Sequence, residues 1–196
     1  EAMARFRREA AALLRLDHPG VVRVHEVGEH EGRPFIAMAM VPGESLHQRL
    51  RRGPLEPRRA ARIAGGLADA LAHLHAQGVI HRDLKPANVL LGAGSEAPVL
   101  VDFGLSRVTL DRQRLTRTGT AVGTPAYMAP EQALGEARPT TALDLYALGA
   151  TLYEMLCGRP PYEGSTALAI LSRLLEGPPP PPSQVRPGVD PELERV

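Results

Sequence analysis

The sequence predicts an α+β fold in which a helix and a β-hairpin precede a mostly helical body. Three patterns support this expectation. Apolar side chains in residues 6–14 lie on one stripe of a helix. Residues 21–41 contain two β-rich runs separated by a Glu-Gly pair, which is typical of an antiparallel hairpin. In residues 63–74, Ile or Leu recurs every three or four positions, which indicates a long amphipathic helix.

Turn and cap residues place the boundaries of these elements. The first helix is expected to end in the segment 17–20, Asp-His-Pro-Gly. The second strand of the hairpin is terminated by Pro42 and Gly43. From Ser45 onward the pattern is helical, and the long helix is expected to stop at Gly78.

The second half of the chain mixes short apolar runs with helices. The runs VIH, NVLL and PVLVDFG predict small strands around a site. Two further helices are expected at about 143–156 and 166–175. Five consecutive prolines, residues 178–182, predict an extended loop rather than a helix.

Composition excludes several classes of protein. A chain that is 43% apolar and 23% charged is ordinary for a globular domain. Its net charge of +1 gives no excess of positive charge that would favour a nucleic acid or an anionic membrane as the principal partner. The local exception is residues 49–62, with six Arg and one acid, which we interpret as a solvated helical surface or, alternatively, a docking patch for an acidic partner.

Cellular context follows from the single cysteine and from the apolar runs. Cys157 cannot form an internal disulfide and lies in an apolar run, which favours a buried small side chain and a reducing, cytoplasmic location. There is no secretory signal, and the most apolar stretch is interrupted by Asp144 and Glu154, so no membrane segment is expected in this chain. Residue 1 is Glu and not an initiator Met, and it lies within the first predicted helix, so we expect this sequence to be a piece of a longer chain.

Two residue types occur only once. Lys85 is the single Lys among 23 cations, and Asn88 is the single Asn. A composition that has drifted towards Arg, Ala, Gly and Pro suggests a coding bias, so a Lys and an Asn retained three residues apart invite a chemical explanation.

That pair belongs to the segment HRDLKPANVLL, residues 81–91, which is followed by Asp102-Phe-Gly. The two segments resemble the catalytic loop and the metal-binding segment of eukaryotic-type protein kinases. The resemblance continues through GTPAYMAPE (123–131) and DLYALG (144–149), and is closest to bacterial Ser/Thr kinases. It implies a protein-kinase-like fold with a mostly helical large lobe.

The resemblance implies a role for each residue in this segment. Asp83 would accept or orient the proton of the substrate hydroxyl, and Lys85 would neutralise charge on the γ-phosphoryl group of ATP. Asn88 would offer a neutral oxygen, and Asp102 a carboxylate, to Mg²⁺ or Mn²⁺. Taken singly, an Asp-x-Lys is usually a surface ion pair and a DFG a turn. His81 is expected to pack against Phe103 rather than to transfer protons.

The resemblance also implies an ATP site built from backbone and apolar side chains. Glu9 resembles the Glu of the regulatory helix that pairs with the ATP-binding Lys, and Leu13, one turn later, matches a core position. The alternative is an i,i+4 pair of Glu9 with Arg5. The remaining implied residues are Met38 at the rear of the pocket, the backbone of the hinge from Ala39 to Val41 at the adenine, and Leu90 as the pocket floor.

Substrate class and control are implied by further positions. Lys85 and Thr124 are typical of the Ser/Thr class, so protein Ser and Thr hydroxyls are the expected substrates. Arg82 and Arg107 would form a basic pocket that binds phosphate on Thr116 or Thr118, with self-association for autophosphorylation. Unmodified hydroxyls in a flexible loop are the alternative.

Some parts of the family's pattern have no counterpart in these residues. Residues 1–41 are interpreted as a partial small lobe and residues 42–196 as a large lobe lacking its last helices. The Gly-rich phosphate loop and the strand-borne Lys are expected upstream of Glu1. We therefore expect the isolated polypeptide to be poorly soluble, because the hairpin leaves an open sheet edge, and to have negligible activity.

The main hypothesis is a Ser/Thr protein kinase that uses Mg-ATP, and two rivals remain. One is a pseudokinase or scaffold that acts by protein binding. Intact Asp83, Lys85, Asn88 and Asp102 argue against it, since a scaffold has no need of metal ligands. The other is a small-molecule kinase, which the GTPAYMAPE segment disfavours because that segment resembles a platform for a protein substrate.

Overall fold

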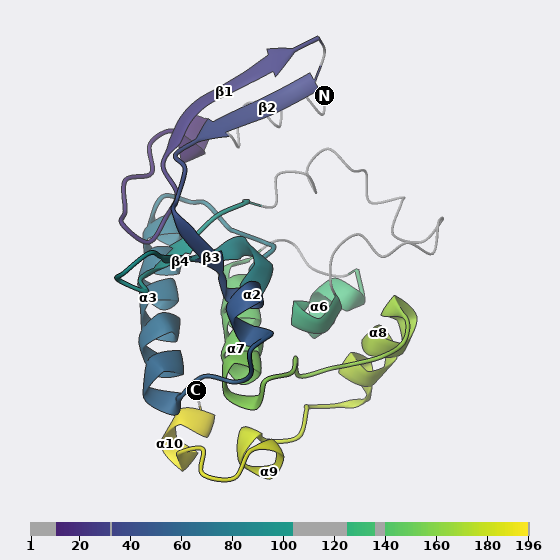
Figure 1. The fold of residues 1–196 in the computed structure, drawn as a ribbon. Helices are drawn as coiled ribbons and strands as arrows, with labels where there is room; N and C mark the ends of the chain where they lie inside the picture. The colour runs from purple at the N-terminus through teal and green to yellow at the C-terminus, as the bar shows by residue number, and fades with distance from the viewer. Residues whose placement is uncertain (1–10, 32, 104–124, 136–139, 196) are drawn as a thin grey trace.

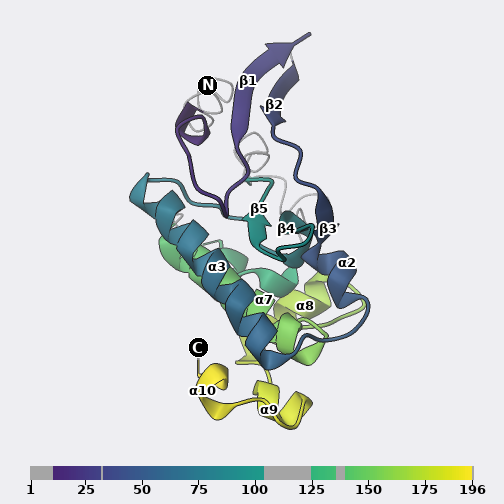
Figure 2. The same ribbon diagram turned by 60° about the vertical axis from the view of Figure 1, so that its left-hand side comes forward.

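The structure, a computed structural model, describes residues 11–31, 33–103, 125–135 and 140–195. A β-hairpin stands at one end of the molecule, a small three-stranded sheet follows it, and helices form the rest (Figure 1). The short helices α9 and α10 lie at the end opposite the hairpin in both views (Figures 1 and 2). This arrangement of small sheets and a helical body confirms the predicted α+β class.

The hairpin consists of β1 (Val24–His30) and β2 (Arg33–Met38), paired antiparallel with His30 opposite Arg33. The prediction of a hairpin is confirmed, but its first strand begins three residues later than expected. The reason is a tertiary contact. Val21 forms a parallel bridge with Leu100, and the Val22 N–H donates to the Leu100 carbonyl at 2.9 Å, so this segment belongs to the sheet below.

The second sheet has the order β3-β4-β5, with all neighbours antiparallel. Its strands are β3 (Gly43–Ser45), β4 (Val89–Gly92) and β5 (Pro98–Leu100). Residue 43 must be Gly, because φ is +150° and a Cβ there would lie 2.0 Å from the Leu91 carbonyl oxygen. This close approach anchors the chain segment that leaves the hairpin onto β4.

The helical body begins at α2 (Leu46–Leu50), which Ser45 and Gln48 cap reciprocally. The long helix α3 (Pro57–Ala76) ends, as predicted, just before Gly78, whose φ is +72°. Its apolar stripe is buried against the rest of the core; the buried residues are Ala60, Ile63, Leu67, Ala70, Leu71 and Leu74. The predicted amphipathic helix is therefore confirmed.

Helix α7 (Thr141–Cys157) packs along α3, and the two helices lie side by side in both views (Figures 1 and 2). Within α7, Cys157 is partly buried against the core and unpaired, as expected for its apolar run. The prediction of α8 (Ala167–Glu176) is also confirmed. In the described part of the chain, no helix is both long and apolar enough to cross a membrane.

The remaining elements are short. They are the 3₁₀ turns η1 (Pro86–Asn88) and η2 (Pro125–Tyr127) and the helices α6 (Pro130–Ala133), α9 (Pro182–Val185) and α10 (Pro191–Glu194). The proline run was predicted to be extended throughout, and for Pro182 this is wrong. Pro182 is the first residue of α9, a position where Pro fits because its missing N–H would have no helical partner.

Candidate active site

Asp144 of α7 holds the start of the HRDLKPANVLL segment. Its carboxylate accepts hydrogen bonds from the backbone N–H of His81 at 2.9 Å and of Arg82 at 2.8 Å. The same carboxylate contacts His75 Nε2 at 2.8 Å, and only 1% of Asp144 is exposed. The VIH run was expected to be a strand and is not one, because the His81 N–H is committed to Asp144 rather than to a neighbouring strand.

His81 packs inside the protein, as predicted. It is fully buried, and its ring lies 5.5 Å from that of Phe103. Its Nε2 lies 3.3 Å from the Val101 carbonyl oxygen, so the neutral ring donates there. Burial lowers the pKa of His81 below its ordinary value, which favours the neutral form.

Three side chains converge at the centre of the loop. Lys85 Nζ lies 2.7 Å from Asp83 Oδ2. Asn88 Nδ2 donates to the same carboxylate oxygen at 3.0 Å and to the Asp83 carbonyl oxygen at 2.8 Å. Asp83 and Lys85 keep 18% and 20% of their side chains exposed, so an incoming group can reach them. The structure thus brings together three of the predicted site residues.

Asp102 lies next to this group by way of the backbone. The Val101 N–H donates to the Asn88 carbonyl at 3.0 Å. Asp102, the next residue after Val101, therefore follows β5 close to the backbone of Asn88. Asp102 is exposed and has a left-handed φ of +58°, as Arg82 has at +66°. Such conformations are uncommon for residues other than Gly and concentrate at functional sites.

Asn88 and Asp102 carry oxygen atoms of the chemical type that binds magnesium. Because Asn88 Nδ2 faces Asp83, its Oδ1 points elsewhere, and it accepts no hydrogen bond within the described residues. A neutral amide oxygen and an exposed carboxylate are ligands that Mg²⁺ prefers. The donor set present is therefore consistent with the predicted cation.

The predicted hinge runs from the end of β2 towards β3. The Ala39 N–H donates to the Arg23 carbonyl at 2.8 Å, so Ala39 can offer adenine only its carbonyl oxygen. The backbone N–H and carbonyl of Val41 carry no hydrogen bond within the described part of the chain. Met38 is 40% exposed, and Leu90 is partly buried on β4, opposite Ser45.

Several predicted site residues lie outside the described residues. They are Glu9, Arg107, Thr116, Thr118 and Thr124. Of the predicted regulatory set, the structure describes Arg82, which lines a small cavity together with Asp83, Lys85 and Tyr127. Leu13, the core position expected one turn after Glu9, is 1% exposed.

Sequence reasoning missed two anchors, both on α7. Asp144 was matched only as part of a motif, and Glu154, which accepts a hydrogen bond from the Tyr127 hydroxyl, was not predicted at all. Burial raises the pKa of Glu154. Burial, and to a smaller extent the charge of Glu154, raises the pKa of Tyr127. Two acids inside an otherwise apolar helix were the available signal, because a buried carboxylate requires partners.

The lowered pKa of His81 predicts acid sensitivity. In the unfolded chain this histidine binds a proton below about pH 6.5, whereas in the folded chain it stays neutral until a lower pH. The contribution of the neutral His81 to the free energy of unfolding is therefore present above pH 6.5 and is lost as the pH falls below it. For one such histidine the free energy of unfolding falls by up to about 1.4 kcal/mol per pH unit. Urea titrations between neutral and acidic pH measure this slope. His81→Phe should flatten it, and His30→Phe on the exposed hairpin should not; equal slopes would contradict the prediction.

Comparison with known proteins agrees with this geometry. The protein kinase domain family matches residues 1–177. The serine/threonine-protein kinase PkaA of Streptomyces coelicolor is 48% identical over 189 residues, which cover 94% of this chain and 34% of the relative. PknD of Mycobacterium tuberculosis is 46% identical over 195 residues, 98% of this chain and 29% of the relative. The chain belongs to the protein kinase domain family, and the resemblance to bacterial Ser/Thr kinases is confirmed.

A third relative is the DNA damage-responsive serine/threonine-protein kinase RqkA of Deinococcus radiodurans. It is 43% identical over 200 residues, covering 98% of this chain and 29% of the relative. The chain thus spans about a third of the length of these curated relatives.

Proposed function

We propose that the protein transfers the γ-phosphoryl group of Mg-ATP to Ser and Thr hydroxyls of proteins in the cytoplasm. The observation that supports this most strongly is the convergence of Lys85 and Asn88 on the Asp83 carboxylate. Phosphoryl transfer needs positioning and charge neutralisation more than covalent chemistry, and these three groups supply both.

In this proposal Asp83 orients the substrate hydroxyl and accepts its proton. Lys85, held 2.7 Å from Asp83, places a compact positive charge where the transferred group gains negative charge. Asn88 and Asp102 would hold Mg²⁺, which when bound neutralises charge on the phosphate oxygens. The Ala39 carbonyl and the Val41 backbone would bind adenine, with Met38 at the rear of the pocket and Leu90 as its floor. Glu9 would pair with the ATP-binding Lys of the small lobe.

Control and organisation are part of the same proposal. Arg82 and Arg107 would bind phosphate on Thr116 or Thr118 after autophosphorylation in a self-associated pair, and Thr124 would contact the substrate segment. Residues 1–41 would act as part of a small lobe and residues 42–196 as a large lobe. Protein substrates are the partners that fit such a site.

The alternative is a pseudokinase or scaffold that acts by protein binding. The exposed left-handed Asp102 argues against it. A backbone conformation of this kind costs about 1–3 kcal/mol, and a scaffold gains nothing from a carboxylate held there.

Peptide phosphorylation tests the proposed function. A protein that includes this chain is incubated with Mg-ATP carrying a labelled γ-phosphate and with peptide mixtures whose sole acceptor is Ser, Thr or Tyr. We expect label on the Ser and Thr peptides. Lys85→Met should lower kcat about 10²-fold or more, because it removes a charge that acts in the transition state.

The matched control is Arg33→Met, which removes a cation from the exposed hairpin and should leave the rate unchanged. Equal rates for Lys85→Met and Arg33→Met would overturn the assignment. Metal-dependent ATP binding without any transfer would favour an inactive kinase, and the absence of ATP binding would favour the scaffold.

A further inference from the structure

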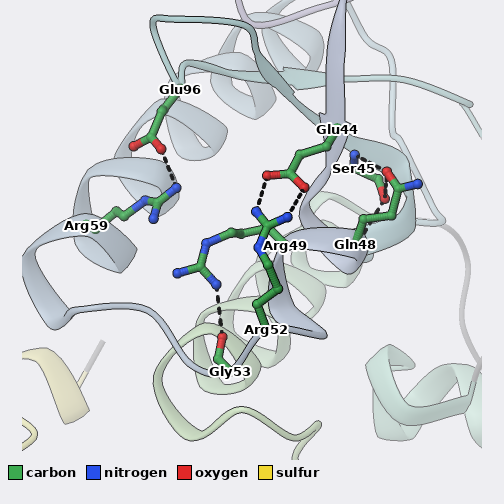
Figure 3. Close-up of polar contacts among 8 residues, drawn as sticks. All are labelled: Glu44, Ser45, Gln48, Arg49, Arg52, Gly53, Arg59 and Glu96. Atoms are coloured by element: carbon green, nitrogen blue, oxygen red, sulfur yellow. Dashed lines mark hydrogen bonds and ion pairs between the residues drawn. The ribbon is translucent and has the colours of Figure 1, made fainter.

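Three arginine side chains gather where β3, α2 and the start of α3 meet. We call Arg49, Arg52 and Arg59 the arginine cluster (Figure 3). Arg49 comes from α2, Arg52 from the turn that follows it, and Arg59 from the first turns of α3. Figure 3 shows the Arg49 side chain between the other two. None of these residues belongs to the proposed catalytic group.

Two members of the cluster already hold carboxylates. Arg52 binds Glu44 through both terminal nitrogens, one of them at 2.8 Å, and Arg59 binds Glu96 in the β4–β5 connection (Figure 3). The two-pronged Arg52–Glu44 contact is the geometry in which a guanidinium group recognises a planar carboxylate. The surface is therefore already shaped for carboxylate binding.

The middle arginine, Arg49, forms no ion pair with an acid of the described residues. Within the described residues, the one hydrogen bond of the Arg49 side chain runs from Nη1 to the Gly53 carbonyl at 3.2 Å, and no carboxylate lies within ion-pair distance. Burial, together with the positive charges of Arg59 and Arg52, lowers the pKa of Arg49. In addition, Arg59 Nε is buried and has no partner among the described residues. The cluster thus holds donors and a positive charge that its own acids do not balance.

Three further arginines lie close to the cluster in the sequence. Arg51, Arg58 and Arg62 are exposed, and in the part of the chain that the structure describes they form no ion pair. Arg58 and Arg62 are four residues apart on α3 and so lie on the same side of that helix. Residues 49–62 contain six arginines and one acid, Glu56, which pairs with Arg186, although the whole chain carries a net charge of only +1.

We propose that the arginine cluster is a docking surface for an acidic segment of a protein partner, with one carboxylate of that segment bound by Arg49. A single carboxylate can pair with Arg49 between Glu44 and Glu96, whereas these flanking acids would repel a continuous polyanion such as a nucleic acid or an anionic membrane. The docking surface does not depend on phosphoryl transfer, so it can be tested separately from the proposed function.

Fluorescence anisotropy tests the proposal on a protein that includes this chain. The probes are a fluorescein-labelled peptide in which single Glu residues are separated by Gly and Asn, its counterpart with Gln in place of Glu, a phosphoserine peptide without acidic residues, and phosphatidylserine vesicles. We expect the Glu peptide to bind and the Gln peptide not to bind. Higher salt should weaken the binding, because exposed charges are screened.

Two substitutions locate the site. Arg49→Gln should raise the Kd of the Glu peptide about tenfold, the loss expected for a charge-assisted hydrogen bond. Arg62→Gln, on an exposed side chain that bonds to no other described residue, should raise it about twofold, and it should not disturb the fold because it removes no hydrogen bond or ion pair there. Arg33→Gln on the hairpin is the matched control and should leave the Kd unchanged.

Three outcomes would overturn the proposal. Equal binding of the Glu and Gln peptides would show a surface without charge recognition, and equal Kd values for Arg49→Gln and Arg33→Gln would place the site elsewhere. Binding of only the phosphoserine peptide or only the vesicles would show that the surface recognises phosphate groups and not carboxylates.

Discussion

Replacing Asp83 by Asn is expected to lower kcat for peptide phosphorylation about 10²- to 10⁴-fold, the range for loss of a positioned acid–base group. The amide cannot take the substrate proton. It also puts a neutral group 2.7 Å from Lys85 Nζ, where the carboxylate now balances the charge. Because Asn has nearly the same shape as Asp, the loop should keep its fold.

Initial rates at saturating Mg-ATP measure this effect, and thermal unfolding checks the fold. Asp17→Asn makes the same chemical change at an exposed residue whose side chain forms no hydrogen bond or ion pair with another described residue, and should leave kcat unchanged. If Asp83→Asn retained full activity at an unchanged melting temperature, the proposed role of Asp83 would be wrong.

Replacing Asp144 by Asn should destabilise the fold most among these substitutions. We expect the free energy of unfolding to fall by about 1.5–3 kcal/mol, the contribution of hydrogen bonds to a buried carboxylate. The carboxylate accepts from two backbone N–H groups and contacts His75, all from a position that is 1% exposed. An amide turns one acceptor into a donor, so at least one of these buried groups loses its partner.

Chemical denaturation at neutral pH gives this free energy, and kcat shows whether the loop has moved. Asp190→Asn is the matched control. Asp190 caps α10 through a hydrogen bond from the Glu192 N–H, and Asn caps helices as well as Asp does. A loss below about 1 kcal/mol for Asp144→Asn would show that the loop is held by other contacts.

The sequence predicted α3, α7 and α8, whose apolar residues recur at helical spacing. The short helices α6, α9 and α10 have no buried residues and were not predicted. The spacing that indicated α3 is the set of side chains that the core covers. Strand β3 could not be predicted, because Gly-Glu-Ser has no alternation of its own and becomes a strand only by pairing with β4. The start of β1 was misplaced for a similar reason, since Val21 and Val22 pair with Leu100 far along the chain.

The candidate site, too, could be predicted only where its residues lie close together in the sequence. Asp83, Lys85 and Asn88 could be predicted because they lie within one short loop, where sequence spacing determines spatial proximity. Asp144 acts on the same loop from 62 residues away, and no local pattern records that contact. The unpaired charge of Arg49 also became visible only once the acids of its neighbours were seen to be occupied by Arg52 and Arg59.

The left-handed backbone of Asp102 has a consequence for engineering. At φ +58° Gly would fit with less strain than Asp, so at this position the demands of stability and of the proposed metal binding oppose each other. A library selected for thermal stability alone should drift towards Gly at residue 102 and lose the proposed ligand. A stabilising campaign on this chain should therefore hold Asp102 fixed and place its substitutions on exposed helix positions.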